Sequence, residues 1–207
     1  MQAVLTGDIV NSTLLSALNE RKLIKQLEAV LSPYQYEFYR GDSFQVYLKN
    51  AKNALRTSML CRAAAIKFSQ AGAGRVNDVR LSIGIGETKT SFKNLSTAKG
   101  EPFILSGRAF DQISKSGARL IILTRENKWL ENQSMQIIAQ YADAVFKELT
   151  PKQASVIFEL LNGQNQFAAA KRLKKSKSTV SQHANSGRWI EIERLLQHFE
   201  NIIEHLL

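Results

Sequence analysis

Cysteine is almost missing from this chain: Cys61 is the only one among 207 residues. A single cysteine excludes an internal disulfide framework and is typical of the reducing cytosol. Long apolar runs are also missing, so the sequence predicts no membrane-spanning helix. No charged segment followed by an apolar one precedes the strand expected to begin at Ala3, which argues against a leader peptide. We therefore expect a cytoplasmic protein with no membrane partner.

Acidic residues are scarce relative to basic ones. The chain has 18 Asp and Glu residues against 28 Lys and Arg residues, which gives a formal net charge of +10 at pH 7. This excess favours a polyanionic partner, either a nucleic acid or a nucleotide, although a solvated basic surface gives the same count. Apolar residues make up 44% of the chain, enough to fill a core.

Hydrophobic periodicity divides the chain into two parts. The first part alternates strands and helices in the order strand, helix, strand, strand, helix, strand, followed by further helical and strand-like segments. We expect strands at residues 3–5, 36–40, 44–48, 79–85, 120–123 and 143–149, and helices at 12–31, 51–70, 107–115 and 128–140. This order predicts an α+β fold, a ferredoxin-like palm with an antiparallel sheet and helices on one face. From residue 150 the pattern is helical, so the expected domains are 1–149 and 150–207.

Two Gly-Asp pairs stand at the ends of expected strands. Gly7-Asp8 ends the first strand, and Gly41-Asp42 forms the tip of a hairpin. If the hairpin pairs with the first strand, Asp8 and Asp42 converge, and two carboxylates are the minimum protein contribution to a Mg²⁺ site. The alternative is that both aspartates are turn formers.

Four motifs in this order resemble the class III nucleotide cyclase domain. They are Gly7-Asp8-Ile9, Gly41-Asp42-Ser43-Phe44, the strand from Arg80 to Glu87, and Gly107-Arg108-Ala109-Phe110-Asp111. In that family two aspartates bind two metal ions that activate a ribose hydroxyl and hold the triphosphate. The resemblance implies that Asp8 and Asp42 bind Mg²⁺ or Mn²⁺, assisted by the Ile9 carbonyl, and that the palm has a nucleotide ligand.

The remaining catalytic residues of that family are replaced here. Asp111 and Lys115 stand where the family has a transition-state Asn and Arg, and Phe38 and Ile104 stand where it reads the purine. An acidic Asp111 repels developing negative charge, and Lys115 lacks the bidentate guanidinium. Because losing one such donor costs about a hundredfold or more in rate, the sequence predicts no working cyclase.

The C-terminal part contains the spacing of a helix-turn-helix. Thr150 to Gln153 is a capping box with Pro151 at the first helical position. Further on, Ala170 is small where two helices cross, Ser176 caps the second helix, and Val180 and Ala184 hold it in place. The residues that we expect to contact DNA are Lys174, Lys175, Lys177, Ser178, Thr179, Ser181, Gln182, Asn185 and Arg188.

This segment resembles the helix-turn-helix of sigma-factor region four and of response regulators, and the whole chain resembles the SatD family of bacterial proteins. We therefore predict a transcriptional regulator that binds duplex DNA, with a degenerate cyclase-like palm for dimerisation and for sensing a nucleotide or metal. The alternatives are a divergent metal-dependent nucleotide cyclase or nucleotidyl transferase, and a palm that is only a dimerisation scaffold. For the C-terminal part alone, the alternative is a helical bundle with a solvated basic face and no DNA partner.

The last helix suggests a homodimer. Its apolar stripe includes Ile192, Leu195, Leu196, Phe199, Ile202, Ile203 and Leu206 and continues to the end of the chain. This is more than three short helices need, so part of the stripe is expected to be exposed as a partner surface. The alternative is that the helix folds back onto the palm and buries the stripe there.

Overall fold

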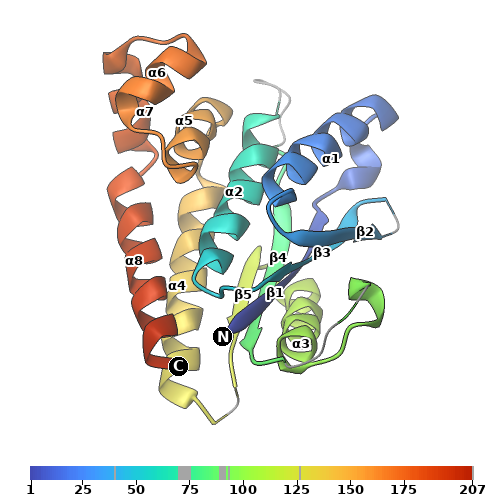
Figure 1. Cartoon of the computed structure of the whole chain (residues 1–207). Helices are drawn as coiled ribbons and strands as arrows, with labels where there is room; N and C mark the ends of the chain where they lie inside the picture. The colour runs from blue at the N-terminus through green and yellow to red at the C-terminus, as the bar shows by residue number, and fades with distance from the viewer. Residues whose placement is uncertain (40, 70–75, 89–91, 93, 126, 207) are drawn as a thin grey trace.

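Alternating apolar residues build a five-stranded sheet at the centre of the computed structural model, which describes residues 1–39, 41–69, 76–88, 92, 94–125 and 127–206 (Figure 1). The strands are β1 (Gln2–Ile9), β2 (Gln35–Tyr39), β3 (Ser43–Leu48), β4 (Val79–Gly86) and β5 (Leu120–Leu123), in the spatial order β2-β3-β1-β4-β5. The sheet and the helices around it agree with the expected α+β class. Positions 40 and 70, at the ends of two expected elements, lie outside the described residues.

The sheet is mixed rather than antiparallel. β1 pairs with β3 and β4 in antiparallel fashion, and β2 pairs with β3 in the same way, but β5 runs parallel to β4. The expectation of a purely antiparallel sheet is therefore wrong at β5. The reason is the crossover through helix α3 (Glu101–Ser116), which returns the chain to the same end of the sheet before β5 begins.

Helices cover both faces of the sheet, so the expectation of helices on one face is also wrong. Helices α1 (Ala17–Leu31) and α2 (Asn53–Lys67) pack on one face, and α3 packs on the other (Figure 1). Gly84 allows the close approach of α3, because a Cβ there would lie 2.2 Å from the Pro102 carbonyl oxygen. The helix begins at Glu101, earlier than expected, with proline in its first turn.

Helix α4 (Trp129–Lys147) is continuous, so the strand expected at 143–149 does not exist. Its apolar residues suggest a strand when read locally, but Ala142, Val145 and Phe146 are buried at helical spacing. Asp143 lies on the same buried side, where it binds a cation from α2. Tertiary packing therefore decides the conformation of this segment.

The C-terminal part is helical, as expected. Its helices are α5 (Pro151–Leu161), α6 (Gln166–Leu173), α7 (Lys177–Ser186) and α8 (Trp189–Leu206). The Thr150 capping box is present, with the Thr150 side chain accepting from the Gln153 N–H at 3.3 Å. None of the helices in the described ranges is long and apolar enough to cross a membrane.

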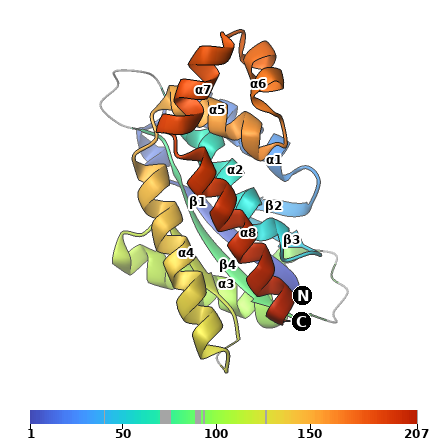
Figure 2. The same ribbon diagram turned by 90° about the vertical axis from the view of Figure 1, so that its left-hand side faces the viewer.

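The apolar stripe of α8 is buried, which corrects the reasoning for a dimer through this helix. Ile192, Leu196, Phe199, Ile203 and Leu206 belong to the same core as residues of the sheet, α2 and α4. Figure 2 shows α8 lying along the palm beside α4. The helix folds back because the palm supplies the apolar surface that the stripe needs, and a second chain is not required for its burial.

A buried ion-pair cluster joins three separate elements. Arg62 of α2 is 1% exposed. Its guanidinium donates to both carboxylate oxygens of Asp78, just before β4, at 3.0 and 2.7 Å, and to Asp143 of α4 at 2.9 Å. Burial alone would lower the pKa of Arg62, but the charges of Asp78 and Asp143 outweigh it and hold the pKa above its usual value. The guanidinium also lies over the Phe146 ring, 5.2 Å from its centroid.

Replacing Arg62 with Met should leave two largely buried carboxylates without their shared cation. We expect the free energy of unfolding to fall by about 3–5 kcal/mol, measured by urea denaturation followed by circular dichroism. Arg21→Met, at an exposed position on α1, is the control and should change stability by less than about 0.5 kcal/mol. Equal denaturation midpoints for the two variants would contradict a stabilising role for the cluster.

Candidate functional site

The strand register brings Asp8 and Asp42 together at one end of the sheet. Asp8 of β1 is opposite Ser43 of β3, and the Ile9 N–H donates to the Asp42 carbonyl at 3.2 Å. Gly41 has a φ of 88°, which the turn between β2 and β3 requires and glycine adopts without strain. The hairpin therefore places the two aspartates next to each other at this end of the sheet, where the charges of both act on Arg80.

Arg80 of β4 already provides a cation at this point. Its Nε donates to one oxygen of Asp8 at 2.8 Å and its Nη2 donates to the other. The hydrogen bonds with Asp8 and the charge of Asp42 raise the pKa of Arg80. The Asp42 carboxylate in turn accepts hydrogen bonds from the hydroxyls of Ser12 and Ser43.

This arrangement fits a guanidinium better than a pair of divalent ions, because both oxygens of Asp8 are occupied by Arg80. Among the described residues, no group of three or more His, Cys, Asp and Glu side chains is suited to a metal ion. The Mg²⁺ or Mn²⁺ site at Asp8, Asp42 and the Ile9 carbonyl stays a prediction. The structure adds that an incoming ion would compete with Arg80 for the Asp8 carboxylate.

Arg80 belongs to one of the four motifs, but the motifs gave it no role, and they did not include Thr6 or Gln45 on the same sheet face. Thr6, Asp8, Ser43, Gln45 and Arg80 share the face that α3 covers only in part. Gln45 donates to the Thr6 hydroxyl at 3.3 Å, and Thr6 and Ser106 of α3 share a hydrogen bond of 2.7 Å. The sequence pattern that could have revealed this face is the alternation of polar residues along each strand, which indicates a solvated or ligand-facing side of the sheet.

The neighbouring edge of this face contains a hydrogen-bonded Tyr39–Glu37 pair on β2. The Tyr39 hydroxyl donates to Glu37 at 3.0 Å, and burial together with this carboxylate raises the pKa of Tyr39. Phe38, between them, points to the opposite face, where its ring lies 5.2 Å from that of Phe44. Because strand neighbours alternate faces, Phe38 cannot lie beside a ligand bound near Asp8.

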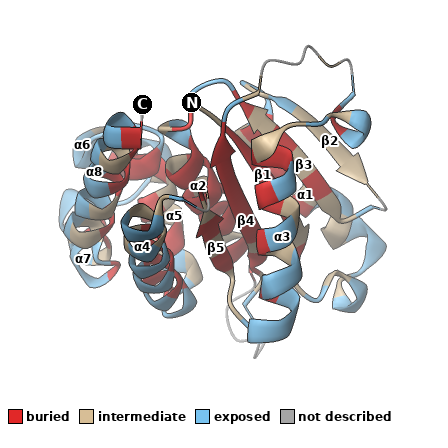
Figure 3. Cartoon of the chain, turned by 90° about the horizontal axis from the view of Figure 1, so that it is seen from below, coloured by how far each residue is buried: buried red, intermediate tan, exposed pale blue. Residues whose placement is uncertain are grey.

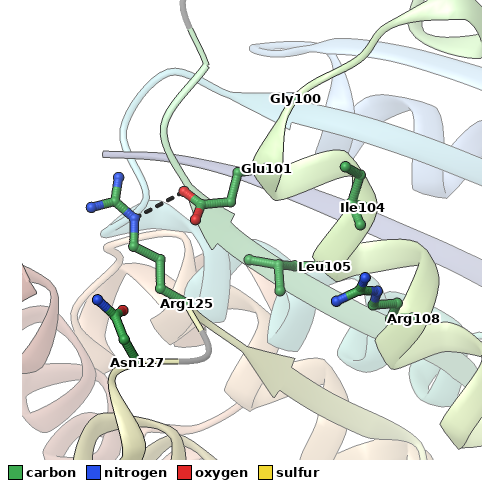
Figure 4. A pocket seen from close by; sticks show the side chains of 7 residues that line it. All are labelled: Gly100, Glu101, Ile104, Leu105, Arg108, Arg125 and Asn127. Atoms are coloured by element: carbon green, nitrogen blue, oxygen red, sulfur yellow. Dashed lines mark hydrogen bonds and ion pairs between the residues drawn. The ribbon is translucent and has the colours of Figure 1, made fainter.

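Helix α3 carries the other residues that stand at catalytic or purine-reading positions of the cyclase motif. Asp111 and Lys115 are exposed, and Ile104 lines a hollow of about 660 Å³ with Leu105, Arg108 and Asn127 (Figure 4). Arg125, across this hollow, pairs with Glu101 at 2.9 Å and with Glu87 at 3.2 Å. Glu101 and Glu87 balance the charge of Arg125. The hollow does not include Asp8 or Asp42, so it is separate from the carboxylate cluster.

Helices α6 and α7 form a helix-turn-helix at the end of the molecule opposite α3 (Figures 1 and 2). The turn passes through Lys174, which adopts the left-handed conformation with a φ of 52°. Ser176 then caps α7, since its hydroxyl accepts from the Thr179 N–H at 3.0 Å. The chain therefore reverses at Lys174 and starts the second helix directly after Ser176.

A small separate core holds the two helices together. Ala170 of α6 and Val180 and Ala184 of α7 are buried with Val156 and Leu160 of α5. The alanines allow the helices to cross closely, and Val180 fills the space between them. The packing expected for Ala170, Val180 and Ala184 is confirmed.

The residues expected to contact DNA lie mostly on the outside of this unit. The exposed ones are Lys174, Lys175, Lys177, Ser178, Gln182, Asn185 and Arg188, whereas Thr179 and Ser181 are half-buried. The Thr179 hydroxyl lies 2.8 Å from that of Ser176, within the helix cap. Arg172, nearby on α6, is balanced by Glu159 at 2.8 Å, and Lys177 lies over the Phe167 ring, 4.7 Å from its centroid.

No match is found when the chain is compared with models of protein families, with curated proteins and with solved structures. The resemblances to class III cyclases, to the SatD family and to sigma-factor and response-regulator helices therefore stay predictions from the motifs.

Replacing Arg80 with Ala should convert the carboxylate cluster into a cation-binding site. Without the guanidinium, the charges of Asp8 and Asp42 repel, so the variant should melt at a lower temperature than the wild type in chelator. Saturating Mn²⁺ should then restore stability by about 2.7 kcal/mol at a hundredfold excess over its Kd, and should shift the wild type less.

Differential scanning fluorimetry with and without Mn²⁺ measures both effects. Arg21→Ala, with the same loss of charge on α1, controls for general electrostatics. If Mn²⁺ raises the melting temperatures of the wild type and Arg80→Ala equally, Arg80 does not compete with a cation at this site.

Proposed function

We propose that this chain is a DNA-binding transcriptional regulator that contacts duplex DNA through α7. The observation that supports this most directly is the outer surface of the helix-turn-helix, where basic and amide side chains are exposed together. Lys174, Lys175 and Lys177 cluster at the turn and the start of α7, and Gln182 and Asn185 follow along the helix. In known helix-turn-helix proteins the second helix enters the major groove with its N-terminal residues at the base edges.

The proposed contacts divide into two kinds. The lysines at the turn neutralise phosphates, which gives affinity without sequence preference. Gln182 and Asn185 carry amides that can donate and accept at an adenine edge, and Ser178 and Ser181 offer hydroxyls. Arg188, after α7 at a φ of 57°, extends the basic surface beyond the helix.

The palm is proposed as the scaffold that carries this unit. Its strand order β2-β3-β1-β4, with α1 and α2 between strands, is compatible with a ferredoxin-like arrangement. We retain a nucleotide as its proposed ligand, through the polar face beside Asp8. A divergent metal-dependent nucleotide cyclase or nucleotidyl transferase is the weaker alternative. The Arg80 guanidinium already binds the Asp8 carboxylate. In addition, Asp111 and Lys115 do not supply the hydrogen-bond donors that such a reaction needs.

We further propose that the protein acts as a homodimer in the cytoplasm. Helix-turn-helix regulators commonly bind two half-sites about 34 Å apart with a two-fold dimer. The α8 stripe no longer supports this part of the proposal, since it is buried within one chain. The symmetry of DNA recognition and the resemblance to cyclases, which form dimers, remain its support.

Changing Lys174, Lys175 and Lys177 together to Ala should make DNA binding less salt-dependent. Each lost phosphate contact reduces the slope of log K against log salt concentration by about 0.9, so the triple variant should lose about 2.7. Fluorescence anisotropy with a labelled duplex at several salt concentrations measures the slope.

The matched control changes Lys22, Lys25 and Lys49, which are exposed on the palm, to Ala and removes the same charge. It should bind with the wild-type slope. Equal slopes for the two triple variants would show that the helix-turn-helix is not the surface that meets phosphates.

The palm should not produce cyclic nucleotides. Incubation with ATP or GTP and Mn²⁺, followed by chromatography, should give no cyclic product above the level of Asp8→Ala. Turnover that disappears in Asp8→Ala would favour the enzyme alternative instead.

A further inference from the structure

Helix α4 exposes an apolar stripe that nothing in the chain covers within the described residues. Trp129 is 70% exposed, Leu130 and Ile137 are each 67% exposed, and Tyr141 is 39% exposed. Leu130, Ile137 and Tyr141 lie on one side of the helix together with Ser134, at the alternating spacing of four, three and four residues that brings two helices together along a seam. Figure 3 shows the outer side of α4 exposed along its length.

Between Trp129 and Ala144 the exposed side of α4 carries no charge, and the exposed Lys147 at the end of the helix pairs with Asp143 at 2.9 Å. The other exposed residues between positions 129 and 144 are Gln133, Gln136, Gln140 and Ala144. Glu131 is half-buried and pairs with Lys128 at 3.5 Å, and Asp143 is buried against Arg62. A neutral surface of this length contrasts with the net charge of +10 of the whole chain.

The stripe continues into a groove beside the edge of the sheet. Strand β5 is last in the strand order, so its outer edge pairs with no described strand. A groove of about 240 Å³ runs along this edge between α3 and α4, lined by Ile121 and by the amide side chains of Gln112, Gln136 and Gln140. Apolar residues flanked by uncharged hydrogen-bonding groups are typical of a protein–protein contact.

We propose that this surface, α4 with the adjoining edge of β5, binds a second copy of the same chain; this places the homodimer of the proposed function. Two bodies of charge +10 repel, and a contact through an uncharged surface adds no local charge repulsion to this. An acidic partner or DNA would gain nothing from a neutral surface. A two-fold dimer brings the same surface of both copies together. The apolar α4 stripe of one copy then packs against the α4 stripe of the other.

In this dimer the α4 helices of the two copies lie parallel, and the two-fold axis runs along them. Helices α6 and α7 lie beyond the C-terminal end of α4 in both views (Figures 1 and 2). Parallel pairing places both helix-turn-helix units at the same end of the dimer, where one duplex can reach both. Antiparallel pairing would place them at opposite ends.

Light scattering of the full chain with Ile137→Glu, Tyr141→Glu and a control tests this surface. The control is Leu18→Glu, which adds the same charge at a leucine that is 62% exposed on α1. At about 100 µM, we expect the wild type and Leu18→Glu to have twice the monomer mass, and the two α4 variants to have the monomer mass with unchanged melting temperatures.

The possible failures are distinguishable. A monomeric wild type overturns both the homodimer and its surface, whereas a wild type and α4 variants that are all dimeric overturn the surface alone. DNA binding is read separately, because monomeric Ile137→Glu should still bind a duplex with the salt dependence given by its lysines. Two single-cysteine variants, Leu130→Cys and Tyr141→Cys, test the orientation. If the helices are parallel, a short bis-maleimide cross-links the introduced cysteine of one copy to the same cysteine of the other copy. Failure to cross-link at both positions overturns the parallel arrangement.

Discussion

The buried contact of Arg62 with Asp78 and Asp143 is the interaction on which the rest of the structure depends. It ties α2 to the start of β4 and to α4, and these elements support everything that follows in the chain. Helix α5 packs against α2, and α8 packs against both α2 and α4. Because an unpaired buried charge is costly, the three elements are held in one relative position. The position of the helix-turn-helix is therefore set by the palm.

The chain separates its charges among three surfaces. Basic side chains gather at the helix-turn-helix, the outer side of α4 is neutral, and the polar sheet face balances Asp8 with Arg80 within the fold. This separation has a physical consequence. A polyanion is attracted to one end of the molecule, while the neutral side allows another basic molecule to approach without charge repulsion. The proposed DNA binding and the proposed self-association can then occur at the same time, because they use different surfaces.

Local signals in the sequence predicted the C-terminal helices, their caps and their packing well. The Ser176 cap, the Thr150 capping box and the small Ala170 and Ala184 act over a few residues, so their effects are visible without the rest of the fold. The errors have non-local causes. The segment 143–149 is helical because Asp143 meets Arg62 from a distant helix, and the α8 stripe is buried because the palm offers a matching surface. The Asp8–Arg80 pair joins residues 72 positions apart, so only the strand register reveals it.

The most direct test of DNA recognition by α7 is a TROSY NMR titration of the ¹⁵N-labelled full chain with a duplex of about 20 base pairs, long enough for two half-sites. At low salt, DNA recognition by α7 predicts amide shift changes concentrated at residues 171–188, with the polar sheet face of β1 and β4 unchanged. Shift changes centred on that sheet face, with residues 171–188 unaffected, would contradict it.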